Sequence, residues 1–155
     1  MSGGVNRAGL LTGLQRLLPG VGAAELKAHR LPLSTGRPRQ PDGRVLLAGD
    51  AASLINPLTG EGIFYAVLSG ALAGSAAVGG GDAGAAYRRA LQRRLGRHLR
   101  HSSTASWASR WPRLMDAVFR AAGDDQRVFD DVVRLGLADG RLTARTLAAA
   151  ARRLR

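Results

Sequence analysis

The chain has 155 residues, a length typical of one domain, and it contains no cysteine, which excludes disulfides and thiolate metal sites. Its net charge of +12 comes almost entirely from arginine, since Lys27 is the only lysine, and abundant alanine and glycine indicate that GC-rich coding accounts for much of this bias. The charge therefore leaves contact with an anionic membrane surface or partner open, while we expect no nucleic-acid binding.

The first part of the chain contains four predicted elements. Residues 6–18 carry leucine at helical spacing and predict an amphipathic helix that ends at Pro19. Residues 25–33 are expected to run extended, and the Pro-, Gly- and Arg-rich residues 35–41 to form a loop. The apolar run at 45–48 has the length and composition of a buried strand.

A glycine-rich loop follows the predicted strand, and Asp50 stands where the strand ends. Open α/β sheets bind ligands at the carboxyl ends of their strands. The helix expected after the loop offers free backbone N–H groups at its N-terminus, which bind anions and electron-rich oxygens. This order of elements predicts a site for a polar, phosphate-bearing cofactor.

Residues 63–81 carry no charge and nearly reach the length of a membrane span. Their many glycines and serines, and Glu61 at the entrance, favour instead a helix over 63–78 that is buried in a soluble α/β protein. Under this interpretation Gly70 and Gly74 lie close to a neighbouring element. Gly74→Leu would then overpack the site at a cost of roughly 1–3 kcal/mol, whereas a membrane span would tolerate it.

Asp82 is the expected N-cap of a third helix that runs to about Ser102. Its core stripe recurs every four residues and consists of Tyr87, Leu91, Leu95 and Leu99. Arginines cover the other face and are interpreted as solvated surface: Arg88, Arg89, Arg93, Arg94, Arg97 and Arg100. Trp107 and Trp111 are assigned together to a fourth helix, where they pack in the core or, as the alternative, line a lipid-substrate channel.

Two shorter helices complete the prediction. One begins at Asp124 or Asp125 and ends at Gly136, and the terminal helix covers 142–154. The three histidines, His29, His98 and His101, do not form a ligand set, so no metal site is expected.

Residues 44–63 resemble the second flavin motif of FAD-dependent hydroxylases and reductases, most of all that of the geranylgeranyl reductase family. The matching residues are Gly49-Asp50-Ala51-Ala52, then Asn56-Pro57-Leu58-Thr59-Gly60-Glu61-Gly62-Ile63, then Ser69-Gly70. The resemblance implies that Asp50 hydrogen-bonds the ribityl chain of FAD. It implies a cofactor-binding set of Gly49, Asp50, Ala51, Pro57, Thr59, Gly60, Glu61, Gly62 and Ile63. For Glu61, proton delivery, capping of the next helix and pairing with an arginine are all open, and no other catalytic residue is assigned.

The family's Gly-x-Gly-x-x-Gly fingerprint and its substrate-binding sheet find no counterpart in the sequence. We therefore expect a mostly helical piece of an α/β fold. Residues 1–81 would be the C-terminal part of a Rossmann-like FAD-binding domain, and residues 82–155 a helical region. A natural fragment, a misplaced start and one piece of a split enzyme all remain open. By itself the segment is expected to bind FAD weakly or not at all, because the pyrophosphate and adenosine contacts are missing.

The resemblance implies hydride transfer from reduced FAD to an isoprenoid double bond of geranylgeranyl type, with NAD(P)H or another donor reducing the flavin. One alternative is a segment of a flavin-dependent aromatic or polyketide monooxygenase. Another is a non-catalytic basic helical interaction module left by truncation. No signal peptide is visible, so we expect a cytoplasmic protein, with peripheral membrane contact as an extension of the lipid-like substrate and the positive charge.

Overall fold

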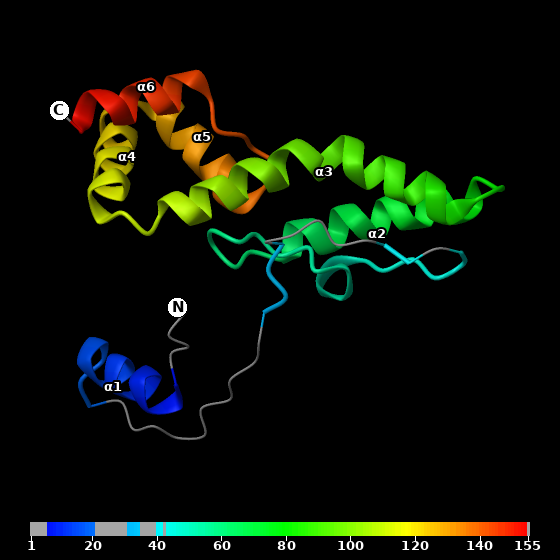
Figure 1. Cartoon of the computed structure of the whole chain (residues 1–155), viewed down its shortest axis with the longest axis horizontal. Coiled ribbons are helices and arrows are strands. Elements are labelled where there is room, and N and C mark those ends of the chain that lie inside the picture. The colour runs from blue at the N-terminus through cyan, green and yellow to red at the C-terminus, as the bar shows by residue number, and fades with distance from the viewer. Residues whose placement is uncertain (1–5, 21–30, 35–39, 42, 155) are drawn as a thin grey trace. The chain divides into compact units, whose positions relative to one another are not determined.

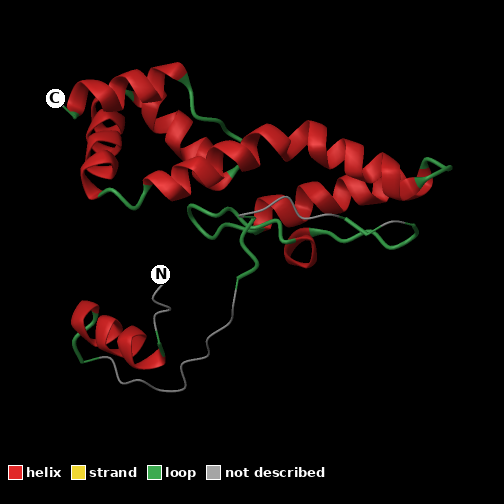
Figure 2. Cartoon of the chain, in the orientation of Figure 1, coloured by secondary structure: helices red, strands yellow, loops and turns green. Residues whose placement is uncertain are grey.

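The computed structural model describes residues 6–20, 31–34, 40–41 and 43–154. Within these residues the chain forms six α-helices, one 3₁₀ turn and no β-strand (Figure 2). The chain divides into two compact units, Met1–Arg30 and Leu31–Arg155, which are described separately. The boundary predicted after residue 81 separates the expected FAD-binding part from the helical region, and it stays a prediction.

The first unit contains helix α1, Arg7–Leu17, as the leucine pattern predicts. Asn6 is its N-cap, and the side-chain Oδ1 accepts a hydrogen bond of 2.8 Å from the Gly9 N–H. Leu10 and Leu17 are 53% and 79% exposed. Most of the extended segment predicted at 25–33 and of the loop predicted at 35–41 lies outside the described residues.

The second unit is built from helices whose starts follow local capping rules. Asp82 caps α3 (Ala83–Ala108), Asp125 caps α5 (Gln126–Leu137) and Thr143 caps α6 (Ala144–Arg153), each through its side-chain oxygen. The other two helices are α2, Ile63–Val78, and α4, Pro112–Asp124. Figure 1 shows α2 running along α3, with α4, α5 and α6 grouped at the far end of α3.

Two apolar clusters form the core of this unit. The first joins α2, α3 and the 3₁₀ turn Gly49–Ala52, and its buried members are Ala52, Leu54, Tyr65, Ala76, Tyr87, Leu91 and Leu95. The second joins α4, α5 and α6 through Ala121, Ala122, Val128 and Ala149. The predicted core stripe of α3 is thereby confirmed, with Leu99 packed against the first cluster.

The strand predicted at 45–48 is wrong as an element of a sheet. A strand needs a neighbour to complete its backbone hydrogen bonds, and no described segment pairs with residues 45–48. The backbone still arrives extended at Ala48, with φ −127° and ψ 159°. Among the described residues, β-type pairing is limited to one isolated parallel bridge between Leu33 and Ile55.

The prediction that α2 is buried on all sides is also wrong. Its bounds match, and Leu68 and Leu72 pack against the first cluster, but Ile63, Val67 and Val78 are 70–88% exposed. A Cβ built at Gly70 or Gly74 meets nothing within 4 Å, so the expected overpacking by Gly74→Leu does not apply to this structure. Only one side of α2 contacts α3 and the motif loop, which leaves the other side uncovered by described residues. No described helix has both the length and the apolar character needed to cross a bilayer.

The two tryptophans do not share a helix, contrary to the prediction. Helix α3 continues six residues past the expected end at Ser102 and includes Trp107, whereas Trp111 is the N-cap residue of α4. Pro112 occupies the first turn of α4, where its missing N–H costs nothing, and it sets the corner between the helices. The pair is half exposed and does not lie in the core.

Candidate functional site

The loop 49–62 contacts α2 at a distance that only glycine permits. The Gly49 N–H donates a hydrogen bond of 2.9 Å to Ser69 Oγ in the second turn of α2. Gly49 has φ +52°, and a Cβ at this position would lie 3.0 Å from the Cβ of Ala66. Ser53 closes the 3₁₀ turn, also with a positive φ of 52°. Gly49 therefore allows the loop to pack directly on the start of α2.

Four candidate residues lie at the surface where the loop enters α2. Asp50 and Ile63 are exposed, and Gly62 is the N-cap residue of α2. A Cβ at Gly62 would lie 3.3 Å from Asp50 Oδ1 and 3.5 Å from Ile55 Cγ1, so the glycine lets the start of α2 lie close to this carboxylate. Ala51 is exposed next to Asp50. These residues, together with the exposed Thr59, belong to the accessible part of the predicted set.

The remaining candidates serve the loop itself. The Thr59 hydroxyl donates a 2.7 Å hydrogen bond to the Gly136 carbonyl, and the buried Pro57 accepts one of 2.8 Å from the Ser106 hydroxyl. Gly60 has φ +77°, a conformation that favours glycine. Glu61 Oε1 accepts a 3.1 Å hydrogen bond from the Phe64 N–H, so it caps the first turn of α2, one of the three roles open for it.

Asn56 is the central residue of a buried polar network that the motif comparison does not single out. It is fully buried, and its side-chain Nδ2 donates to the Tyr65 hydroxyl at 3.1 Å and to the Leu135 carbonyl at 2.8 Å. Its Oδ1 accepts from the Leu58 N–H at 2.9 Å. The amide therefore joins the loop 49–62 to the end of α5, 79 residues later in the chain.

Tyr65 and His98 extend this network into α3. The Tyr65 hydroxyl lies 2.5 Å from His98 Nε2, and His98 Nδ1 lies 2.6 Å from the Gly140 carbonyl oxygen. A carbonyl can only accept, so Nδ1 carries the hydrogen, and the neutral ring then accepts at Nε2 from the Tyr65 hydroxyl. Burial raises the pKa of Tyr65 to about 12 and lowers the pKa of His98, which keeps both groups neutral near pH 7.

These contacts had little signal in the sequence. Tyr65 and His98 are 33 residues apart, and His98 stands among arginines that suggest a solvated helix. The one available clue was position: His98 lies three residues after Leu95, on the stripe that the structure buries. A polar side chain on a core stripe has to find a buried partner.

The accessible part of the loop fits a hydroxyl-bearing cofactor such as FAD. The exposed Asp50 carboxylate, which lies beside the start of α2, is an acceptor for hydroxyl groups. The described residues contain no group of three or more acidic, histidine or cysteine side chains able to hold a metal ion.

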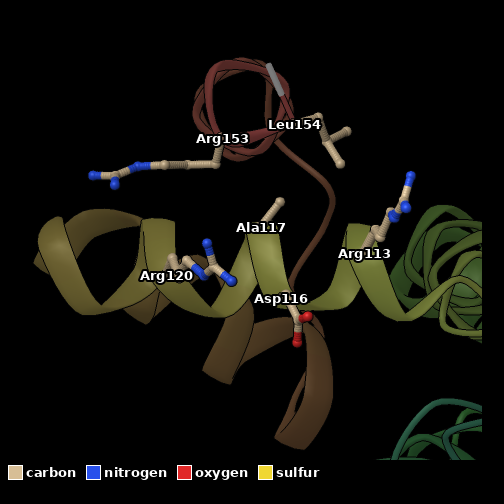
Figure 3. Close-up of a pocket in the computed structure, with 6 residues that line it drawn as sticks. All are labelled: Arg113, Asp116, Ala117, Arg120, Arg153 and Leu154. Atoms are coloured by element: carbon tan, nitrogen blue, oxygen red, sulfur yellow. The ribbon is translucent and has the colours of Figure 1, made fainter.

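A separate shallow cavity of about 160 Å³ lies between α4 and α6 and contains none of the motif residues. Figure 3 shows its lining side chains, which are Arg113, Asp116, Ala117, Arg120, Arg153 and Leu154. Arg153 pairs with Asp124 at its edge. The carboxylates of Asp116 and Asp124 offset part of the charge of the three arginines.

The chain is similar to part of several curated proteins. It is 41% identical over 75 residues to an uncharacterised protein of Methanosarcina barkeri, covering 48% of this chain and 19% of that protein. It is 40% identical over 63 residues to the geranylgeranyl diphosphate reductase of Synechocystis (41% and 15% covered). It is 42% identical over 55 residues to the chloroplastic enzyme of Oryza sativa (36% and 12% covered).

No family model and no solved structure matches the chain. The chain spans less than a fifth of the length of the curated relatives it matches. The comparisons thus identify a region within this chain that is similar to geranylgeranyl diphosphate reductases.

Proposed function

We propose that this chain is a segment of an FAD-dependent reductase that acts on isoprenoid double bonds. The observation that carries the proposal is the 40–42% identity to geranylgeranyl diphosphate reductases from a cyanobacterium and two plants. The ordered flavin-like motif at 44–63 supports the same function. In this proposal residues 1–81 contribute to a Rossmann-like cofactor domain and residues 82–155 form a helical region.

FAD, when bound, supplies the hydride chemistry, and NAD(P)H is the proposed donor that reduces it. The chain's own residues bind and orient. Asp50, which is exposed beside the start of α2, would accept hydrogen bonds from hydroxyl groups of the ribityl chain. The hydrogen bonds of Asn56 and Thr59 to α5 hold the loop in one conformation before a ligand binds.

A chimeric enzyme tests this function. The segment of the Synechocystis geranylgeranyl diphosphate reductase that matches this chain is replaced by the corresponding segment of this chain. FAD content is then measured by absorbance, and reduction of geranylgeranyl diphosphate by mass spectrometry. We expect a flavin-loaded chimera that reduces the substrate, and the same chimera with Asp50→Ala should retain less FAD.

The opposing result is equally clear. A chimera with native circular dichroism but no bound FAD would show that the loop is not a flavin loop. A chimera that binds FAD and consumes oxygen to hydroxylate an aromatic substrate, without reducing the isoprenoid, would replace the reductase assignment by a monooxygenase.

A further inference from the structure

The outer face of α3 carries arginines and a tryptophan in a single row. Arg93, Arg100 and Trp107 follow one another at intervals of seven residues, close to two helical turns, and Arg97 stands one turn from both arginines. All four residues are exposed, while the buried residues of α3 occupy the opposite side. At 1.5 Å per residue the row is about 21 Å long.

No negative charge interrupts this face. Residues 83–115 contain neither aspartate nor glutamate. Asp139 lies 2.7 Å from Arg94, which is outside the row. Within the described part of the chain, Arg93, Arg97 and Arg100 make no ion pair. Their charge is therefore free to attract an external anionic surface.

The row ends at an exposed pair of tryptophans, which are the only two in the chain. Trp107 and Trp111 are 58% and 44% exposed, and their ring centroids lie 4.2 Å apart with the planes at 67°. The backbone N–H of Trp111 donates a hydrogen bond of 3.1 Å to the Ala108 carbonyl, and Pro112 begins α4 directly afterwards. Figure 1 shows the corner between α3 and α4 at this point, and both tryptophans are exposed there.

We propose that this arginine–tryptophan row, formed by Arg93, Arg97, Arg100, Trp107 and Trp111, docks on an anionic lipid bilayer. Indole rings favour the boundary between headgroups and acyl chains, where the apolar ring and the polar N–H are both accommodated. Arginine attracts anionic headgroups, and a straight helix can lie flat along the surface. The positive charge of the row and the indole rings at its end therefore both fit an anionic bilayer.

A nucleic acid fits the row less well. Proteins that bind single strands stack bases on open aromatic faces. Here the two indoles contact each other edge to face, so a ring face is already covered. The inference does not depend on the reductase function, because docking needs neither flavin nor substrate.

The test uses the full 155-residue chain and vesicles of phosphatidylcholine, alone or mixed with phosphatidylglycerol. Tryptophan emission reports only on the docking corner, since both tryptophans lie there. We expect a blue shift, quenching by spin-labelled lipid and co-sedimentation with the anionic vesicles. Replacing Arg93, Arg97 and Arg100 by glutamine should lower the partition coefficient on the order of 100-fold, given the usual attraction of three arginines at an anionic surface.

A control variant has the same net charge as this triple variant. Arg127, Arg134 and Arg141 are exposed arginines outside α3, and their replacement by glutamine removes equal charge from other surfaces. We expect this control to retain most of the binding. An equal loss in both triple variants would overturn the proposal, as would equal binding to neutral vesicles. An emission change with a single-stranded oligonucleotide but none with vesicles would assign the row to nucleic acid instead.

Discussion

His98 is a fully buried histidine whose two ring nitrogens are both in contact with oxygen atoms. The Tyr65 hydroxyl has one hydrogen and two acceptors within reach, His98 Nε2 at 2.5 Å and the Ala138 carbonyl at 2.9 Å. It can donate to only one of them while the ring is neutral. The protonation state of the imidazole therefore decides which of the two acceptors receives the hydrogen of the Tyr65 hydroxyl.

The lowered pKa of His98 predicts a dependence of stability on pH. Burial is the main cause, opposed by the Gly140 carbonyl and Asp139, and reinforced by His101 and Arg141. In the unfolded chain the ring titrates near its ordinary pKa of 6.5. As the pH falls below this value the unfolded state takes up a proton that the native state does not, so the free energy of unfolding decreases until the native pKa is passed.

The measurement is urea unfolding of the wild type and of His98→Gln at several pH values from neutral to mildly acid. We expect the wild type to lose more stability than the variant over this range, because glutamine does not titrate. His29 and His101 are present in both proteins, which differ only at position 98. Parallel pH profiles for the two proteins would show that His98 titrates alike in the folded and unfolded chain.

Asp50 is predicted to serve the ligand and not the fold. Its side chain is exposed beside Gly62, so Asp50→Ala should leave the thermal unfolding midpoint of this chain nearly unchanged. In the chimeric reductase the same change should weaken FAD binding by about 1–3 kcal/mol, the range for losing a charged hydrogen-bond partner. An FAD dissociation constant equal to that of the parent chimera would contradict the role assigned to Asp50.

At the scale of elements, two glycines with opposite surroundings test how the loop meets α2. Gly49→Ala places a Cβ 3.0 Å from that of Ala66 at a φ of +52°, and we expect a loss of about 1–3 kcal/mol. Gly70→Ala, inside α2 with nothing within 4 Å of its Cβ, should instead gain about 0.5–1 kcal/mol from helix propensity. Chemical denaturation of both variants measures the difference. Equal effects would mean that the loop does not pack on α2.

The helices were largely predictable because their signals are local. Asp82 makes the predicted capping hydrogen bond at the start of α3, and Asn6 and Asp125 cap α1 and α5 in the same way. The prediction of a strand at 45–48 failed because strand formation depends on a partner segment that no local pattern specifies. The corner at Trp111 was missed for a related reason, since the apolar pattern continues through it and only Pro112 indicates the break.

The candidate site divides in the same way. Asp50, Gly62 and their accessibility follow from a motif that is continuous in sequence, and their roles toward FAD stay predictions. The buried network of Asn56, Tyr65 and His98 joins three separate segments through the carbonyls of Leu135 and Gly140. Hydrogen bonds to backbone carbonyls carry no side-chain signature at the partner position, so sequence patterns could not reveal them.

At the scale of the second unit, its two apolar clusters share no residue. Hydrogen bonds from Asn56, Thr59 and His98 link the segments that carry the first cluster to the end of α5 and to the turn before α6. Separating α4, α5 and α6 from the rest would therefore break these polar contacts, while the apolar side chains within each cluster stay packed together.

Such an opening has a thermodynamic signature. It exposes less apolar surface than global unfolding, so its free energy should depend weakly on urea, with a small m value. We expect native-state hydrogen exchange to show amides of α5 and α6 exchanging through an opening with a smaller m value than amides of α2 and the first half of α3. A single isotherm shared by all these amides at low urea would mean that the polar contacts make the two clusters one cooperative unit.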